Sequence, residues 1–423
     1  MSDASKVVVV GLGYVGLPLA VALAEHGDVV GYDIDQRRIA ELEEGHDRTR
    51  EVERGRLQAS RLEVTGDPAR CVGAGVYIVT VPTPIDGDNK PDLSPLIAAS
   101  RAIAGWIDPA RRPTIVFEST VYPGVTEDIC GPEIERVSGL KRGRDFRLGY
   151  SPERINPGDQ VHSVDRIVKV IAGEDDEVVE QLATLYGAMT SAGVFRAASI
   201  KTAEAAKVIE NAQRDINIAF MNEVAQIFGR IDLSIWDVLA AARTKWNFLP
   251  FEPGLVGGHC IGVDPYYLSH LAQSLDLHPQ VVLAGRSTND QMGAWVADRL
   301  HERRGGKPGR ALVMGLTFKE NVPDLRNSRT ADIVRRLDAL GYDVALTDPI
   351  ANPEEAARDY GRTPITLNGE AYDLVVAAVA HDEYRALDDG QLAGLVGEGG
   401  TLADLKGMWR TRQLAVSIDR WVL

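Results

Sequence analysis

The chain has 423 residues, a formal net charge of −15 and 44% hydrophobic residues. This length exceeds what one hydrophobic core usually serves, so we expect two or three domains. The acidic balance argues against a nucleic acid or an anionic membrane surface as partner, because both attract a basic protein face. Three scattered cysteines fit neither a disulfide framework nor a paired-cysteine zinc site, so we expect a cytoplasmic protein without a metal.

The most apolar stretch of the chain, Val7 to Ala24, could be mistaken for a signal sequence or a membrane span. It contains three glycines and Pro18, and it lacks a basic leader and a small-residue cleavage pattern. We therefore predict that it forms a buried strand followed by a helix.

Apolar runs rich in β-branched residues alternate with helical patterns from Lys6 to about residue 195. The predicted strands are Val7–Val10, Val29–Tyr32, Val76–Val81, Thr114–Phe117 and Val168–Ile171. This alternation is typical of a parallel sheet covered by helices. Residues 1–198 are therefore predicted to form one Rossmann-like domain.

The next region, residues 199–304, is rich in alanine and has apolar residues at helical spacing. Residues 203–228 contain neither glycine nor proline, which predicts one long helix. Residues 305–309 have the composition of a linker, and strands are predicted beyond it at Ala311–Met314, Asp343–Leu346 and Leu374–Val379. The predicted fold class is α/β, with two Rossmann-like domains with parallel sheets joined by a central helical segment.

A glycine-rich motif follows the first predicted strand, with the sequence Gly11-Leu12-Gly13-Tyr14-Val15-Gly16. Glycines at these positions permit a tight turn, close approach of a pyrophosphate and packing of the helix on the strand. The second strand ends in Asp33, at about the distance expected for the acid that binds ribose hydroxyls. Because Asp33 would repel a 2′-phosphate, NAD is favoured over NADP. The alternative is a glycine-rich turn without a ligand.

A second loop holds a thiol among glycines, with the sequence Gly257-Gly258-His259-Cys260-Ile261-Gly262-Val263-Asp264-Pro265. A loop thiol near a helix start can be kept as the reactive thiolate, which favours Cys260 as a nucleophile. The alternative is a buried structural cysteine, which is our interpretation of Cys71 and Cys130. His259 is interpreted as shaping the site rather than as its base.

Lys207 and Asn211 lie four residues apart in the predicted helix Lys201–Phe228 and so project from one face. A lysine and an amide there could stabilise a developing alkoxide or hold a water. The alternative is a solvated surface lysine, and spacing alone does not decide between the two.

Together with four further motifs, these three features resemble the UDP-glucose/GDP-mannose dehydrogenase family over essentially the whole chain. The most specific element is the glycine-glycine-x-cysteine loop with Asp264 four residues later, combined with the Lys-x-x-x-Asn helix. The further motifs, in chain order, are Val81–Pro84, Glu118–Gly124, Ser151–Arg154, and Gly315–Glu320 with Arg326–Ser328.

The resemblance implies three domains with separate tasks. Residues 1–198 would be the NAD-binding domain, and residues 199–304 a central helical dimerisation domain that carries the cysteine loop. Residues 305–423 would be a Rossmann-like domain that binds a UDP-sugar. A homodimer that uses NAD and a UDP-sugar is the resulting expectation.

The resemblance also implies roles for individual residues. Catalytic roles fall on Cys260, Lys207, Asn211, Asp264, Glu153 and Thr120. NAD contacts fall on Gly11, Gly13, Tyr14, Val15, Gly16, Asp33, Thr83 and Thr120. Nucleotide-sugar contacts fall on Glu153, Arg154, Lys207, Asn211, Arg243, Phe248, Gly257, Phe318, Lys319 and Arg326, with Arg243 reaching a neighbouring subunit's site. From the residues alone, Lys319 and Arg326 are basic loop residues that could equally be solvated.

These roles imply that a primary alcohol is oxidised twice, to a carboxylate. Asp264, through a water held with Lys207 and Asn211, would remove the alcohol proton. Cys260 would bind the aldehyde as a thiohemiacetal that is oxidised to a thioester. Glu153, with Thr120 positioning water, would hydrolyse that thioester.

The segments 151–159 and 245–251 resemble the branch of the family that oxidises UDP-N-acetylhexosamines for bacterial surface polysaccharides. UDP-N-acetylglucosamine or its galacto epimer is therefore favoured, with UDP-glucose as the alternative, since one small group is often weakly discriminated. The polar segment 47–52 could contact substrate or form a surface loop. A non-catalytic sensor and a two-electron hydroxyacid dehydrogenase remain as other classes, and the number of NADH formed per sugar distinguishes all three.

Overall fold

The computed structural model describes residues 6–155, 163–258, 261–367, 369–414 and 417–423. The chain divides into two compact units. Unit 1 comprises Met1–Glu210 and Tyr266–Leu277, and unit 2 comprises Asn211–Pro265 and His278–Leu423. Among the described residues, no helix has both the length and the apolar character needed to cross a bilayer.

Unit 1 is built on a sheet with strand order β3-β2-β1-β4-β5-β6-β7-β8 among its described residues. In that order the strands are Glu63–Thr65, Val29–Tyr32, Val7–Val10, Val76–Val79, Thr114–Phe117, Arg147–Tyr150, Lys169–Gly173 and Val194–Arg196. The helices are α1 (Gly16–Ala24), α2 (Gln36–Glu43), α3 (Arg54–Ala59), α4 (Ser94–Ala104), α5 (Gly131–Ser138) and α6 (Asp176–Met189), with short helical turns at η1 (Pro68–Cys71), η2 (Pro109–Arg111) and η3 (Val125–Cys130).

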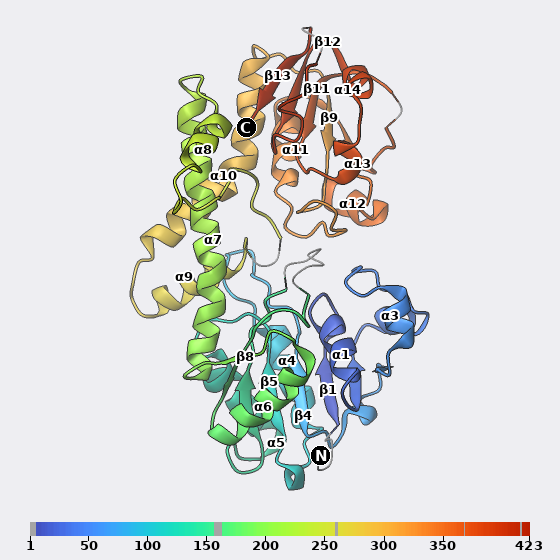
Figure 1. Cartoon of the computed structure of the whole chain (residues 1–423), viewed down its shortest axis with the longest axis vertical. Coiled ribbons are helices and arrows are strands. Elements are labelled where there is room, and N and C mark those ends of the chain that lie inside the picture. The colour runs from blue at the N-terminus through green and yellow to red at the C-terminus, as the bar shows by residue number, and fades with distance from the viewer. Residues whose placement is uncertain (1–5, 156–162, 259–260, 368, 415–416) are drawn as a thin grey trace. The chain divides into compact units, whose positions relative to one another are not determined.

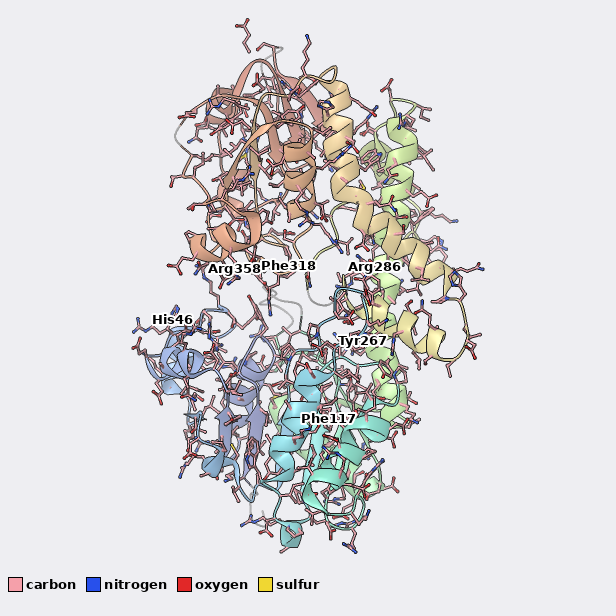
Figure 2. The ribbon with its side chains drawn as sticks, turned by 180° about the vertical axis from the view of Figure 1, so that it is seen from behind. His46, Phe117, Tyr267, Arg286, Phe318 and Arg358 are labelled. Atoms are coloured by element: carbon pink, nitrogen blue, oxygen red, sulfur yellow. The ribbon has the colours of Figure 1, made fainter. Side chains whose placement is uncertain are left out.

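The central strands of unit 1 are buried on both faces, which explains their continuous apolar sequence. In β1, Val8 and Val10 face one hydrophobic cluster while Val7 and Val9 face the other. Phe117, labelled in Figure 2, ends β5 within the first cluster. The five strands predicted for this region are confirmed to within two residues at each end, and β3, β6 and β8 were not predicted.

The prediction of a wholly parallel sheet is wrong at one position in unit 1. Strand β7 runs antiparallel to β6, pairing Gly149 with Gly173 and Tyr150 with Ala172. The other neighbouring strands pair in parallel. The described residues that connect β6 to β7, 151–155 and 163–168, form no helix, and a crossover to a parallel neighbour usually needs one.

Unit 2 contains a parallel sheet with strand order β10-β9-β11-β12-β13 among its described residues (Figure 1). In that order the strands are Asp343–Thr347, Arg310–Met314, Tyr372–Ala377, Val396–Asp404 and Asp419–Val422. Its helices are α8 (Ile235–Ala242), α10 (Gln280–Arg303), α11 (Thr330–Ala339), α12 (Pro353–Tyr360), α13 (Asp382–Arg385) and α14 (Asp389–Leu395). Helix α10 packs on α11, and both contribute to the core that covers one face of this sheet.

The predicted long helix is confirmed as α7, Ile200–Gly229, which has 30 residues and a length of about 45 Å. Helix α9 (Asp264–Ser274) begins immediately after the cysteine loop. The fold class is therefore α/β as predicted, with two sheets and a long helix, one sheet being mixed rather than purely parallel.

Candidate active site

The glycine-rich loop between β1 and α1 shows why each of its glycines is needed. Gly11 has φ +97°, a conformation that side chains other than glycine rarely adopt. A Cβ on Gly16 would lie 1.8 Å from the carbonyl oxygen of Gly11, so only glycine lets the helix start so close to the strand. A Cβ on Gly13 would meet nothing within 4 Å. The chain itself does not require glycine at Gly13, and that space is left to a ligand.

The Asp33 carboxylate is tied to the glycine-rich loop. Its Oδ2 accepts a hydrogen bond from the backbone N–H of Leu12 at 2.8 Å, and its Oδ1 accepts one from Asp35 at 2.9 Å. The side chain stays only partly buried, and each carboxylate oxygen has a second lone pair. Asp33 can therefore accept hydrogen bonds from ribose hydroxyls while it orients the loop.

The first turn of α1 is open to an anion. Its N-cap residue is Val15, which offers no side-chain hydrogen bond to the first backbone N–H groups. Tyr14 and Val15 are half-buried at the same turn. A helix start without a side-chain cap suits the pyrophosphate of a dinucleotide, so the residues present fit NAD.

Thr83 and Thr120 lie in the segments that follow β4 and β5, two neighbouring parallel strands. Both are half-buried, and the Ser119 hydroxyl donates to the carbonyl of Val81 at 2.6 Å, which ties the two segments together. The carboxyl ends of parallel strands form the usual ligand-binding edge of such a sheet. The glycine-rich loop after β1 lies at this same edge.

Glu153 is buried and fully hydrogen-bonded. Its Oε1 accepts the backbone N–H groups of Arg154 and Ile155, each at 2.5 Å. Its Oε2 accepts from Lys169 Nζ at 3.1 Å, and the same ammonium donates to Glu118 Oε2 at 2.6 Å. The Tyr186 hydroxyl donates to the other oxygen of Glu118.

Sequence reasoning missed Lys169, Glu118 and Tyr186 as functional candidates. The available signal was Lys169 itself, a charged residue inside the apolar run predicted as a strand. Arg154, which was predicted to contact substrate, forms an ion pair of 2.9 Å with Glu210. Both side chains are partly exposed, so this ion pair is weaker than the buried one of Lys169.

Asn211 and Asp264, distant in sequence, meet in unit 2. The Asn211 side-chain amide donates to Asp264 Oδ2 at 2.5 Å, and both residues are buried. Asp264 is the first residue of α9, and Asn211 lies one turn beyond Lys207 on α7. Lys207 is buried as well, at 7% exposure, so the alternative of a solvated surface lysine is wrong.

Cys260 and His259 lie outside the described residues. The glycines before them pack on the loop 315–328 of unit 2. A Cβ on Gly257 would lie 2.5 Å from the carbonyl oxygen of Asn327, and one on Gly258 would lie 2.7 Å from the ring of Phe318. Close packing on the chain's own loop therefore requires glycine at both positions.

The remaining predicted substrate contacts in unit 2 are largely engaged with other parts of the chain. Arg326 donates twice to the Asp324 carboxylate, at 2.9 and 2.7 Å. Arg243 forms an ion pair of 2.5 Å with Glu252, and Phe248 packs against a small apolar cluster around Trp236. Phe318 and Lys319 are half-buried in the loop after β9.

Asp348 fixes the loop that carries Phe318 and Lys319, and sequence reasoning did not single it out. It follows β10 as Asp33 follows β2, and its carboxylate accepts the N–H groups of Leu316, Thr317, Ile350 and Ala351. Burial alone would raise the pKa of Asp348, but hydrogen bonds from His381 and the backbone lower it below its ordinary value. The signal in the sequence was an aspartate two residues after the end of a predicted strand.

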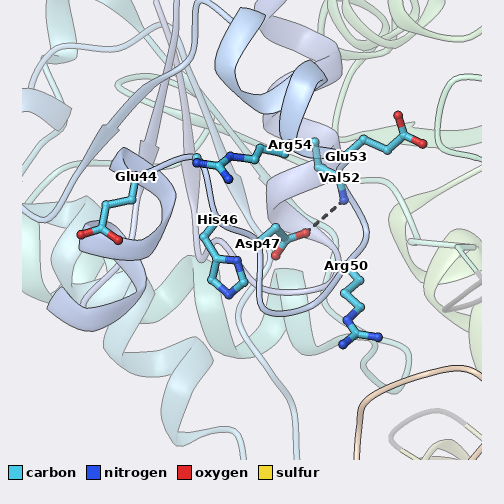
Figure 3. Close-up of a pocket in the computed structure, with 8 residues that line it drawn as sticks. Glu44, His46, Asp47, Arg50, Val52, Glu53 and Arg54 are labelled. Carbon is cyan, nitrogen blue, oxygen red and sulfur yellow. Dashed lines mark hydrogen bonds between the residues drawn. The ribbon is translucent and has the colours of Figure 1, made fainter. Parts of the chain in front are cut away.

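The segment 47–52 is organised around Asp47, whose carboxylate is buried. It accepts from Arg38 and from the N–H groups of Thr49, Glu51 and Val52, and Figure 3 shows the bond to Val52. Burial would raise the pKa of Asp47, but the hydrogen bonds from Thr49 and Arg38 lower it. Asp47 thus holds the loop, while His46, Arg50 and Arg54 line an open hollow beside it.

Cys71 and Cys130 are buried free thiols. Burial raises the pKa of Cys71 to about 11 and that of Cys130 to about 12, so neither forms a thiolate readily. Both thus fit the structural role interpreted for them. In the described ranges, no group of three or more His, Cys, Asp or Glu side chains could hold a metal ion.

A mostly parallel sheet covered by helices, with a glycine-rich loop between β1 and α1, is typical of a dinucleotide-binding protein. The chain matches three domains of one family: the NAD-binding domain over residues 5–190, the central domain over 201–291 and the UDP-binding domain over 312–411. It belongs to the UDP-glucose/GDP-mannose dehydrogenase family and is an NAD-dependent nucleotide-sugar dehydrogenase, as the sequence motifs predicted.

The chain is similar to two proteins named UDP-N-acetyl-D-glucosamine 6-dehydrogenase. The one from Pseudomonas aeruginosa is 51% identical over 408 residues, which is 95% of this chain and 96% of that protein. The one from Salmonella typhi is 44% identical, covering 96% of each chain. The structure of a UDP-glucose dehydrogenase from Pyrobaculum islandicum superposes with a TM-score of 0.87 at 27% identity, covering 99% of this chain and 98% of that one.

We predict that Gly16→Ala and Gly13→Ala weaken NAD binding for different reasons. The Gly16→Ala methyl group must displace the Gly11 carbonyl, at a cost of about 1–3 kcal/mol in unfolding free energy. Gly13→Ala should leave stability unchanged and fill only the space meant for the ligand. Thermal unfolding and NAD titration of both variants check this. Unchanged NAD affinity in Gly13→Ala would contradict the assignment.

Proposed function

We propose that this enzyme oxidises the 6-hydroxymethyl group of a UDP-N-acetylhexosamine to the carboxylate, in two NAD-dependent steps. The buried Asn211–Asp264 pair carries the proposal, because it sets an amide and a carboxylate next to the loop of Cys260. The names of the two relatives favour UDP-N-acetylglucosamine. UDP-N-acetylgalactosamine and UDP-glucose are the competing substrates.

The first oxidation needs a base for the alcohol proton and a cation for the alkoxide. Asp264, acting through a water held with Asn211, takes the proton, and the Lys207 ammonium stabilises the developing negative charge. Bound NAD accepts a hydride in this and in the second oxidation. The hydrogen bond from Asn211 keeps the Asp264 carboxylate in one orientation.

The second oxidation depends on Cys260. Its thiol adds to the aldehyde carbon, and the carbonyl oxygen takes up a proton, giving a thiohemiacetal. Loss of a hydride and a proton then leaves a thioester on Cys260. The covalent link retains the aldehyde between the two oxidations.

Hydrolysis of the thioester completes the reaction. Glu153 takes a proton from a water held near Thr120, the oxygen of that water adds to the thioester carbon, and the Cys260 sulfur leaves as a thiolate. The backbone N–H groups that hold Glu153 Oε1 fix the orientation of this carboxylate.

We assign these tasks to three domains, residues 1–198 for NAD, 199–304 for the cysteine loop and dimerisation, and 305–423 for the UDP-sugar. An exposed apolar stripe on α7 supports a homodimer. Ile209, Phe220 and Ile227 are each more than half exposed and lie on one side of the helix, close to three and two turns apart. A second copy of the same face would cover the stripe.

The substrate is tested by offering UDP-N-acetylglucosamine, UDP-N-acetylgalactosamine, UDP-glucose and GDP-mannose and by counting NADH per product. We expect two NADH per acid and the highest kcat/KM with UDP-N-acetylglucosamine. One NADH per product would indicate a two-electron dehydrogenase, and binding without any NADH would indicate a sensor. A preference for UDP-glucose would refute the proposed sugar.

Cys260→Ala should stop acid formation while NAD and the UDP-sugar still bind, because no thioester can form. NADH counting and mass spectrometry of the product check this. Cys130→Ala is the matched control, since that thiol is buried and has a raised pKa, and it should retain two NADH per acid. Acid production by Cys260→Ala at the wild-type rate would exclude the thioester route.

Phe220→Glu should dissociate the proposed dimer, because it buries a charge in the apolar stripe. Sedimentation or light scattering should give twice the chain mass for the wild type and one chain mass for this variant. Val137→Glu, an exposed apolar residue on α5, serves as the control and should leave the mass unchanged. A monomeric wild type would refute the dimer.

A further inference from the structure

We propose that Glu118 and Lys169 form a buried proton relay with Glu153, in which Glu118 finally accepts the proton that Glu153 takes from the hydrolytic water. In this relay, Glu118 and Lys169 are positioning residues that act through Glu153. The inference rests on the proposed role of Glu153 in thioester hydrolysis.

The direction of β7 brings the three side chains together. The antiparallel pairing of Tyr150 with Ala172 puts Lys169, the first residue of β7, toward the end of β6 that Glu153 follows, and Lys169 Nζ donates to Glu153 Oε2 at 3.1 Å. Glu118 directly follows β5, the strand on the other side of β6. A parallel β7 would have carried Lys169, its first residue, to the opposite edge of the sheet.

The cluster holds one cation between two carboxylates, away from water. The side chains of Lys169 and Glu118 are 0% exposed and that of Glu153 is 7% exposed. The fourth titratable group that faces them is Tyr186 on α6, which donates to Glu118 and places its ring 5.2 Å from the Lys169 ammonium. With both carboxylates ionised, the cluster carries a net negative charge, so it favours the uptake of one proton.

Glu118 is suited to accept that proton near neutral pH. Burial raises its pKa to about 7, although the Lys169 charge opposes the shift. Burial alone would lower the pKa of Lys169, but Glu118 and Glu153 together raise it above its ordinary value. Lys169 is therefore an ammonium before the relay begins and again when it ends.

The relay moves one proton from the hydrolytic water to Glu118. Water loses a proton to Glu153 Oε2 as its oxygen bonds to the thioester carbon. Lys169 Nζ then gives the proton of its hydrogen bond with Glu118 to Glu118 Oε2, and the lone pair that this leaves on Nζ turns toward Glu153 and takes up the proton from Glu153 Oε2. The existing hydrogen bonds of 3.1 and 2.6 Å mark these two paths. Glu153 is an ionised base again, and Glu118 later releases its proton.

Stability alone gives little reason to keep such a cluster. A buried ion pair often stabilises a protein no more than apolar side chains of similar size, because desolvation offsets the attraction. Lys169 opens a strand whose other buried residues, Val170, Ile171 and Ala172, are apolar. An apolar residue at this position alone would leave two buried carboxylates without their cation, and only replacing all three side chains would remove the desolvation cost, so stability does not by itself explain the cluster.

The test measures the decay of the Cys260 thioester after limiting UDP-sugar is mixed with excess NAD, by quenching and intact-protein mass spectrometry. Wild-type decay should accelerate as pH rises through about 7, because Glu118 can accept a proton only when ionised. In Glu118→Gln, both NADH should still form, decay should slow about tenfold or more, and this pH dependence should disappear.

Tyr186→Phe tests the relay more specifically than Glu118→Gln, because it removes one hydroxyl and keeps the ring. The hydrogen bond from Tyr186 lowers the pKa of Glu118, so its loss should move the pH midpoint of thioester decay upward. The rate at high pH should stay close to that of the wild type. A purely structural tyrosine would leave the midpoint unchanged.

Glu174→Gln is the matched control at the other end of β7, where Glu174 pairs with Arg142 at 2.6 Å. It should lose a similar ion pair and leave the pH profile of thioester decay unchanged. A profile altered equally by Glu174→Gln and Tyr186→Phe would overturn the relay, since general loosening of unit 1 would then explain both.

Glu153→Gln separates this inference from the proposed function. Wild-type thioester decay in Glu153→Gln would overturn both the hydrolytic role of Glu153 and the relay. If the thioester accumulates in Glu153→Gln while Glu118→Gln and Tyr186→Phe keep the wild-type rate and pH profile, only the relay is overturned. Accumulation in Glu153→Gln and Glu118→Gln, together with the shifted midpoint in Tyr186→Phe, supports both.

Discussion

The common direction of β1, β4, β5 and β6 is the constraint on which the unit 1 site depends. Neighbouring parallel strands end at the same edge of a sheet, so the segments that follow them are gathered there whatever their distance in sequence. The glycine-rich loop, Thr83, Thr120 and Glu153 each follow one of these four strands. The buried apolar sequence of the strands thus also positions the polar residues that come after them.

Local patterns predicted the elements well and their directions less well. Strands buried on both faces and a helix of 30 residues leave clear signatures, which is why β1 and α7 were found nearly to the residue. Strand direction leaves no such signature, because an apolar run looks the same in either orientation. The antiparallel β7, and with it the place of Lys169, could not be read from the sequence.

Residue types alone did not give the reason why each residue is needed. Packing of the helix on the strand was an expected reason for a glycine of the first motif, and the close contact of Gly16 with the Gly11 carbonyl agrees with it, whereas the close contact of Gly257 with the Asn327 carbonyl was not predicted. Of the glycines in the loop after β1, only Gly13 faces open space. Similarly, the resemblance linked Asn211 to Asp264 only through a shared water, whereas the fold joins the two side chains by a direct hydrogen bond. A motif fixes spacing along the chain, whereas contacts across the fold decide what each position does.

Charge pairing explains how an acidic chain can bind an anionic nucleotide sugar. Arg154 and Arg243 are already paired with carboxylates, and both members of each pair are between a third and a half exposed. Such exposed pairs contribute only about 0–1 kcal/mol, so a phosphate can replace the carboxylate at little cost. Lys207 is buried instead, where an ammonium interacts more strongly with a nearby negative charge than it would in water. In the roles proposed above, the surface arginines would suit reversible binding of the nucleotide, and the buried lysine would suit a charge that develops only during the reaction.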